Sequence, residues 1–250
     1  MTVSDVPKSH PRYTSLRDRE IIVKGVEDGI TSLAGLTAHG RGEAFDYLLG
    51  EKTSGPARKA VEATCALFLL SDYPVISVNG NTAALVPVEL VKLSNVIGAK
   101  IEVNLFHASK QREKKIVAHL KKNGAEEVLL PGGAKLPGIK SNRRMISAQG
   151  QKSADTIFVP LEDGDRTEAL ISMGKKVVTV DLNPLSRTAK KATISIVDNI
   201  VRVLPLMIEL LQKMKKMEKK KLQKILDNFD NGKNLSLSLL VIKKRLKCTI

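Results

Sequence analysis

Residues 35–51 (GLTAHGRGEAFDYLLGE) come closest to a known phosphate-binding motif. The phosphate-binding loop reads G-x-x-x-x-G-K-[ST]; two glycines here have that spacing, but Arg41 replaces the lysine and Gly42 replaces the hydroxyl residue. A phosphate-binding loop follows a buried strand, and the preceding GITSLAGLTA lacks the character of one. We therefore reject this motif for residues 35–51. A narrower hypothesis is a turn at Gly40, Arg41 and Gly42 that brings the backbone close to a ligand and offers one guanidinium to phosphate, with a helix beginning near Glu43.

Four polar segments each follow a short run with the composition of a strand. Ligands of an open parallel sheet bind beyond the carboxyl ends of its strands, where helix N-termini offer unpaired N–H groups. Each segment alone is explained by turn and helix-capping residues, but four together favour a binding site. The segments are VNGNTAAL (78–85), VPLEDGDRTEAL (159–170), VDLNPLSRTA (180–189) and VDNIVR (197–202).

The second of these segments is rich in carboxylates. Glu162, Asp163, Asp165 and Glu168 occur within seven residues. Such a cluster could hold Mg²⁺ through water, as enzymes that use nucleoside triphosphates require. The alternative is that the acids lie at a helix N-terminus, where the helix dipole favours negative charge.

The third segment offers groups suited to a nucleotide. Asp181 and Asn183 could hydrogen-bond a ribose or a base edge, and Arg187 could grip a phosphate in two places. A plain surface arginine in a loop is the alternative for Arg187. Near the N-terminus, Arg17 and Arg19 lie on an expected helix that could face the same loops.

The periodicity of the chain predicts the elements that would position these side chains. Helical spacing is expected over 11–30, 41–49 and 56–72, which gives an N-terminal helical portion over residues 1–72. From residue 73 to 211, β-branched runs alternate with helical ones, which predicts a parallel, doubly wound α/β sheet. The expected strands are PVISV, KIEVNLF, AEEVLL, DTIFVP, KKVVTVD and ATISIVD, and the expected helices are 87–97, 109–124, 165–174 and 199–217.

Two segments fit this alternation poorly. Residues 131–153 are rich in glycine and proline and are expected to form a long loop or small insertion. Residues 212–250 form a basic extension, in which a continued helix and then a strand at LSLSLLVI are conceivable. A solvated or weakly ordered appendage is the favoured interpretation of that extension.

Composition limits the possible functions. Of the net charge of +15, residues 213–247 carry +9, from twelve basic and three acidic residues, so the high pI belongs mostly to the extension. Only 3% of residues are aromatic, which disfavours stacking on single-stranded nucleic acid, and nucleic acid is not an expected partner.

Neither the two cysteines nor the four histidines have metal-ligand spacing, so no protein metal site is predicted, and Cys65 is expected in the core. No run reaches the ~18 apolar residues of a membrane span, and a cytoplasmic location is expected.

Longer stretches of the chain resemble the archaeal phosphopantothenate synthetase family, also called 4-phosphopantoate–β-alanine ligases. The resemblance covers roughly residues 8–211 and implies a Rossmann-like fold and a homodimer. It also implies that 4-phosphopantoate and β-alanine are joined through an acyl-adenylate, with ATP cleaved to AMP and diphosphate and with Mg²⁺ present, on the route to coenzyme A. The stretches are HPRY-SL-RE (10–20), GLTAHGRGEAFDYLLGEKT (35–53), PVISVNGNTAALVP (74–87), GAKIEVNLF (98–106), PLEDGDRTEALISMGKKV (160–177) and DLNPLSRTAKKATISIVDNIVR (181–202).

The same resemblance implies roles for individual residues. Arg41 and Arg187 are the expected catalytic arginines. Substrate contacts are inferred only from the motif match and from their place at strand ends, for Asn79, Asn81, Asp163, Asp165 and Arg166. The expected ATP contacts are Arg19, Arg41, Asp181, Leu182, Asn183, Arg187, Thr188, Asn199 and Ile200.

Two other classes of function stay open at this point. A kinase-like phosphotransferase on an α/β fold would use similar polar loops but would leave ADP. A nucleic-acid-binding protein would act through the basic extension, and its binding would be sensitive to salt.

Overall fold

The computed structural model describes residues 6–106, 108–140 and 144–247, and a parallel sheet lies at its centre. Its five strands run in the order β2-β1-β5-β6-β7, with every neighbouring pair parallel. All five residues of β1 are buried, as expected for a strand covered on both faces. The predicted α/β class is therefore confirmed. The strands are β1 (Pro74–Val78), β2 (Lys100–Val103), β5 (Thr156–Phe158), β6 (Lys176–Val180) and β7 (Ile194–Ile196).

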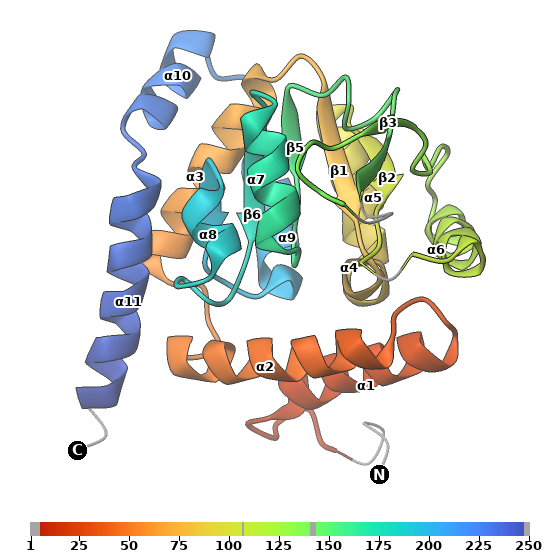
Figure 1. The fold of residues 1–250 in the computed structure, drawn as a ribbon. Coiled ribbons are helices and arrows are strands. Elements are labelled where there is room, and N and C mark those ends of the chain that lie inside the picture. The colour runs from red at the N-terminus through yellow and green to blue at the C-terminus, as the bar shows by residue number, and fades with distance from the viewer. Residues whose placement is uncertain (1–5, 107, 141–143, 248–250) are drawn as a thin grey trace.

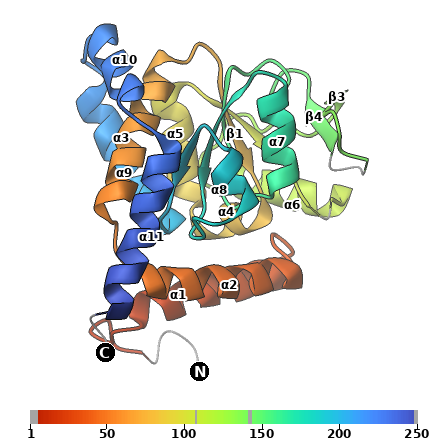
Figure 2. The ribbon, with the colours of Figure 1, turned by 60° about the vertical axis from the view of Figure 1, so that its left-hand side comes forward.

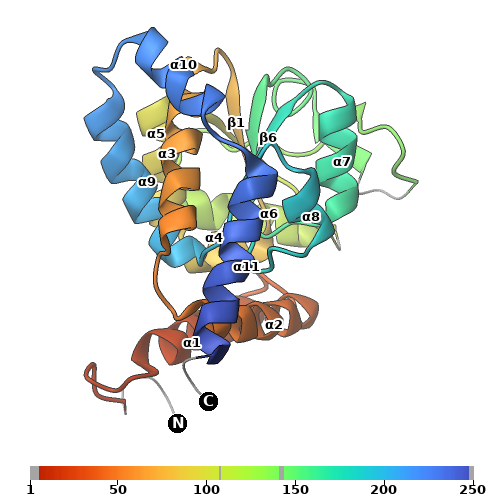
Figure 3. The same cartoon turned by 90° about the vertical axis from the view of Figure 1, so that its left-hand side faces the viewer.

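Alternate residues of the strands enter two separate cores. Ile76 packs into the larger cluster, beneath α3 (Gly55–Leu70), α5 (Pro87–Ile97) and α9 (Ile200–Met214), while Val75 packs into the smaller one. The smaller cluster is covered by α7 (Gly164–Ser172) and by an antiparallel pair of short strands within the expected insertion. Figure 3 shows α3, α5 and α9 on one side of the sheet, and α7 and α8 (Arg187–Lys191) on the other. The pair consists of β3 (Gly133–Lys135) and β4 (Met145–Ser147).

Helices α1 (Tyr13–Glu27) and α2 (Leu33–Leu49) form a separate layer below the carboxyl ends of the strands (Figure 1). The turn predicted at Gly40 to Gly42 is wrong, because these residues lie inside α2. The helix begins earlier than Glu43 since the Ser32 side chain caps it, accepting a bond from the Gly35 backbone N–H at 3.2 Å. A Cβ on Gly42 would stand 3.4 Å from Leu182 Cδ1, so this position of α2 faces the loop after β6.

Two further helices complete the α/β alternation: α4 (Gly80–Leu85) follows β1, and α6 (Lys110–Lys122) follows β2. The strand predicted at AEEVLL is wrong. Only Leu129 forms a bridge there, parallel to Glu102, because Pro131 follows directly and has no N–H to extend the ladder. Cys65 is fully buried as predicted, and Cys248 lies outside the described residues.

The C-terminal extension is ordered and helical. It forms α10 (Lys219–Asp227), which packs on α3, and α11 (Asn231–Lys247), which contacts α3, α8, β7 and the end of α2 (Figure 2). Leu222 and Leu235 are buried, so both the strand predicted at LSLSLLVI and the weakly ordered appendage are wrong. Across the described ranges, no helix is long and apolar enough to cross a membrane.

Candidate active site

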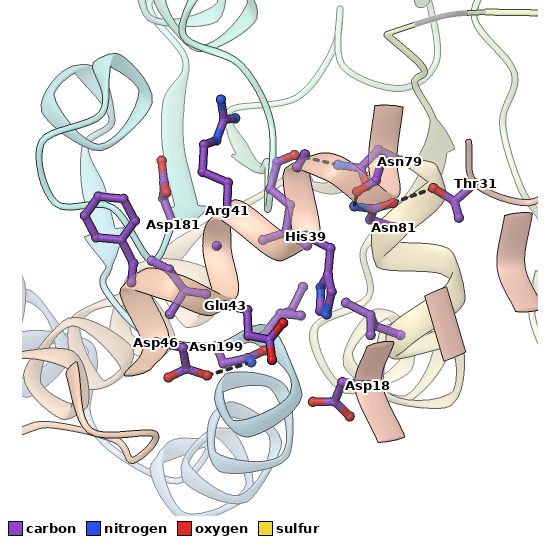
Figure 4. Close-up of a pocket in the computed structure, with 18 of the residues that line it drawn as sticks. Asp18, Thr31, His39, Arg41, Glu43, Asp46, Asn79, Asn81, Asp181 and Asn199 are labelled. Atoms are coloured by element: carbon purple, nitrogen blue, oxygen red, sulfur yellow. Dashed lines mark hydrogen bonds between the residues drawn. The ribbon is translucent and has the colours of Figure 1, made fainter. Parts of the chain in front are cut away.

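A cavity of about 870 Å³ lies between the α1–α2 layer and the carboxyl ends of the strands. It is enclosed from the sheet side by the loops after β1, β5, β6 and β7, and from the other side by α2 (Figure 4). Ten of the fourteen residues predicted for the site line it: Arg41, Asn79, Asn81, Asp163, Asp181, Leu182, Asn183, Thr188, Asn199 and Ile200.

The N-termini of α7 and α9 both open on this cavity. Asp163 caps α7 by accepting a bond from the Arg166 backbone N–H at 3.1 Å, and Asn199 caps α9 through Val201 at 3.3 Å. Each helix end carries a partial positive charge, and these ends favour bound anions. The cavity is therefore suited to a ligand that carries phosphate.

Arg41 brings a positive charge to the cavity from α2. Its side chain lines the cavity, and within the described ranges it makes neither a hydrogen bond nor an ion pair. Figure 4 shows Arg41 projecting from α2 toward the side where Asp181 lies. Asp181 accepts bonds from the Asn183 backbone N–H at 2.9 Å and from the Ser186 hydroxyl, so its loop is held in place while the guanidinium is available.

Asn79 and Asn81 serve the structure of the site as well as lining it. The Asn79 amide donates to the carbonyl oxygens of Pro160 and Leu161 at 2.9 and 3.0 Å, which ties the loop after β1 to the loop after β5. Asn81 donates to the Gly35 carbonyl at 2.8 Å and so fixes α2 over the strand ends. Substitution of either residue would change the shape of the cavity.

Four predicted residues do not line the cavity. Arg19 donates two bonds of 2.8 Å to Glu43, whereas Arg187 is exposed and pairs with Asp165 at 2.6 Å and with Glu168. These are surface ion pairs that a phosphate could replace. Asp165, the third of the four, is thus a partner of Arg187. The fourth residue, Arg166, is buried, and its Nε lies 3.8 Å from Oε2 of Glu162.

The carboxylates of the second segment do not converge on one point. Asp163 caps a helix, Glu162 lies beside Arg166, and Asp165 and Glu168 face Arg187. In the described part of the chain, no group of three or more His, Cys, Asp or Glu residues could hold a metal ion.

The sequence did not predict the cavity residues that α1, α2 and α9 contribute. Asp18, His39, Glu43, Asp46 and Arg202 all line the cavity, yet none follows a strand. The only signal in the sequence is the spacing of His39, Glu43 and Asp46, at i, i+4 and i+7, which places them on one face once α2 is extended back to Leu33.

Burial shifts the pKa of several lining groups, among them two aspartates and a histidine. Desolvation raises the pKa of Asp18, against the opposing effect of Arg17, and raises the pKa of Asp181, against the hydrogen bonds from Ser186 and Asn183. Desolvation lowers the pKa of His39, although nearby carboxylates act in the opposite direction. The His39 imidazole is therefore neutral at neutral pH.

The chain matches one protein-family profile and is similar to several curated proteins over most of its length. The profile of the family described as phosphopantothenate/pantothenate synthetase matches residues 56–245. A 4-phosphopantoate--beta-alanine ligase of Thermococcus kodakarensis is 54% identical over 97% of this chain and 94% of its own length. One from Methanosarcina mazei is 50% identical over 98% and 97%. The similarity thus includes the C-terminal extension, beyond the residues 8–211 over which the motifs resemble the family.

Proposed function

Because this chain belongs to the phosphopantothenate/pantothenate synthetase family, we propose that it is a 4-phosphopantoate–β-alanine ligase of coenzyme A biosynthesis. It condenses (R)-4-phosphopantoate with β-alanine to 4'-phosphopantothenate. ATP is the co-substrate and is cleaved to AMP and diphosphate. The reaction belongs to the class in which a carboxylate is activated as an acyl-adenylate.

The unpaired guanidinium of Arg41 is the observation that supports this proposal best. A ligase of this kind must bring together a triphosphate and a phosphorylated acid, which repel each other. Arg41 lines a cavity on which two helix N-termini also open. Asp181 attracts it electrostatically, but no carboxylate in the described ranges is close enough to form an ion pair with it. It can therefore bind phosphate without first breaking a salt bridge.

The reaction has two steps in one cavity. The carboxylate of 4-phosphopantoate attacks the α-phosphorus of ATP, and diphosphate leaves. The amine of β-alanine then attacks the carbonyl carbon of the acyl-adenylate, and AMP leaves. Placing the reactants side by side and stabilising the charge on the phosphorus supply most of the acceleration in such a step.

The remaining site residues divide by their position. We assign nucleotide contacts to Asp181, Leu182, Asn183, Thr188, Asn199 and Ile200, and substrate contacts to Asn79, Asn81 and Asp163, all of which line the cavity. Arg19 and Arg187 would reach a phosphate only by leaving Glu43 in one case and Asp165 and Glu168 in the other. Asp165 and Arg166 would act only indirectly, through Arg187 and Glu162.

Three properties of the enzyme are part of the same proposal. No three acids of the described residues converge on one point, so we propose that the phosphate oxygens of ATP would hold most of the Mg²⁺. A homodimer is proposed, and Leu33 and Tyr47, which are 71% and 68% exposed on α2, offer apolar surface for it. A cytoplasmic location fits a biosynthetic reaction that consumes ATP.

Product analysis tests the reaction. Purified protein is given ATP, 4-phosphopantoate and β-alanine, and the nucleotides are separated by chromatography. AMP and diphosphate should appear in equal amounts only when both other substrates are present. Release of ADP and phosphate would instead indicate a kinase-like phosphotransferase, and the absence of any product would contradict the ligase.

A further inference from the structure

His39 is a cavity residue whose side chain has no structural task. It lies on α2, is half-buried, and within the described residues neither of its ring nitrogens takes part in a hydrogen bond. Figure 4 shows it on the α2 wall between Asn81 and Asp18, projecting in a different direction from Arg41. The two residues thus serve separate regions of one cavity.

Charged groups from two helices surround the imidazole. Burial lowers the pKa of His39, whereas Glu43 and Asp46 on α2 and Asp18 on α1 raise it, and Arg19 on α1 lowers it. At neutral pH the ring is therefore neutral and has a nitrogen lone pair. Three carboxylates stand ready to stabilise the imidazolium that forms if the ring gains a proton.

The other candidate bases that face the cavity from α1 and α2 already have partners. Asp18 accepts a 2.9 Å bond from Arg17, Glu43 accepts bonds from Ser15 and Arg19, and Asp46 is held by α9. Among the described residues that line the cavity there is no lysine, cysteine or tyrosine. Glu51 also lines the cavity, but it is exposed. His39 is therefore the half-buried group that has both a free acceptor atom and neighbouring carboxylates that favour a proton on it.

We propose that His39 is the catalytic base that takes a proton from the ammonium group of the amine substrate, an inference that rests on the proposed ligase function. The ammonium nitrogen has no lone pair, so it must lose one proton before it can attack, and this proton goes to His39. The neutral nitrogen then forms a bond to the acyl carbon, the bond from that carbon to the adenylate oxygen breaks, and AMP leaves with the electron pair. The second proton shed by the nitrogen passes to the departing AMP phosphate.

The environment favours this transfer from both sides. An ammonium group taken from water into a partly enclosed cavity has a lowered pKa, which makes it a stronger acid. The imidazolium that results is stabilised by Asp18, Glu43 and Asp46. Proton transfer by a positioned base contributes typically about 10²–10⁴-fold to a rate.

The test separates the two steps of the reaction in the variant His39→Gln. Adenylation is followed without amine, as exchange of labelled diphosphate into ATP in the presence of 4-phosphopantoate. Amide formation is followed with β-alanine, and separately with hydroxylamine, which is uncharged at neutral pH and needs no base. Thr37→Ala, an exposed position on the same helix that does not line the cavity, is the matched control.

We expect His39→Gln to lower kcat with β-alanine about 10²-fold or more, to change exchange by no more than a few-fold, and to retain the reaction with hydroxylamine. Rising pH should partly restore the rate with β-alanine, because more of the amine is then neutral in solution. An equal loss of exchange and amide formation, or unchanged turnover of β-alanine, would overturn the proposal for His39. Absence of exchange in the unmodified enzyme would instead contradict the ligase function, so the two failures are distinguishable.

Discussion

Asp46 and Arg202 join α2 to α9 through two hydrogen bonds, Nη2 to Oδ1 at 2.5 Å and Nη1 to Oδ2 at 3.1 Å. The same guanidinium holds Asp198, which is 1% exposed, so one arginine satisfies two carboxylates from different elements. Asn199 adds a third link to Asp46 at 2.9 Å. Because α2 carries both Arg41 and His39, this clamp fixes the distance between the α2 wall and the strand-end loops.

Removal of the clamp should destabilise the fold. Arg202→Ala leaves Asp46 and Asp198 without their shared partner, and we expect a loss of roughly 3 kcal/mol in the free energy of unfolding, measured by urea denaturation. Asp46→Asn in the Arg202→Ala background should cost less than the same change alone. Lys213→Ala, which removes an exposed ion pair with Glu209 at the far end of α9, should leave stability unchanged. Equal effects of the two alanine variants would contradict a structural role for the clamp.

Arg41→Ala should raise the KM for ATP about tenfold or more, or abolish turnover, since it removes the available charge-assisted contact to phosphate. The fold should be intact, because among the described residues the side chain has no hydrogen bond or ion pair to lose. Steady-state kinetics together with circular dichroism check both points.

Arg187→Ala provides the comparison for Arg41. In the structure this arginine is occupied by Asp165 and Glu168 on the protein surface, so we expect a smaller change in KM than for Arg41→Ala. A loss of kcat as large as that of Arg41→Ala would show that Arg187 leaves its carboxylates to bind a phosphate during turnover.

Binding of ATP should weaken in acid through Asp181. Burial raises the pKa of this carboxyl, so it is protonated at a less acidic pH than an ordinary aspartate, and a protonated group is a poorer acceptor for a ribose hydroxyl. Calorimetric titrations at several pH values should show affinity that is full near neutrality and declines below it. Asp181→Asn should bind less tightly at neutral pH and vary less with pH.

The free energy of unfolding should also depend on pH through Asp181, but it should fall as the pH rises, whereas ATP binding should weaken as the pH falls. A carboxyl whose pKa is raised in the folded state contributes stability that is fully present below its unfolded pKa and is lost as the pH rises through its folded pKa. Asp181→Asn should therefore remove part of the decline in unfolding free energy over that window. A steeper decline in the variant would contradict the raised pKa.

The alternating core was predictable, whereas the walls of the site were not. Runs such as PVISV, with turn residues directly after them, identify a buried strand and its polar loop from local pattern alone. The prediction at Gly40 and Gly42 was wrong because glycine favours turns, whereas here both residues lie inside a helix that the Ser32 side chain caps. No local pattern could have placed His39 beside Asp18, since they come from two helices and meet through tertiary packing.

Local sequence pattern also failed to predict the C-terminal helix α11. LSLSLLVI alternates like a strand, but Asn234, Leu235 and Ser238 face inward with helical spacing. The Asn231 side chain fixes the start of α11 by accepting a bond from the Ser195 backbone N–H at 2.8 Å. Tertiary contacts of this kind override the strand propensity of a short segment.

Gly50 should be intolerant of substitution, because it ends α2 in the left-handed region with φ of 97°. An added Cβ would also stand 2.7 Å from Nη1 of Arg245 on α11. We expect Gly50→Ala to lower the free energy of unfolding by about 1 kcal/mol or more. Gly98 ends α5 with φ of 66° but has open space around it, so Gly98→Ala isolates the backbone effect. If the two substitutions lower the free energy of unfolding by the same amount, the contact with Arg245 contributes nothing to the loss at Gly50.

The basic extension should prove to be part of the enzyme. Leu235 packs with Leu49 of α2 and Leu182 of the loop after β6, so α11 supports two walls of the cavity from behind. Leu235→Ala should cost about 2 kcal/mol or more in the free energy of unfolding and raise the KM for ATP, whereas Leu240→Ala, at an exposed position of the same helix, should do neither. Deletion of residues 213–250 should abolish ligase activity, measured as AMP release, because it uncovers α3 as well as these walls. A truncated protein that keeps full activity and loses only salt-sensitive binding to DNA or RNA would instead support the nucleic-acid role that the charge of this segment first suggested.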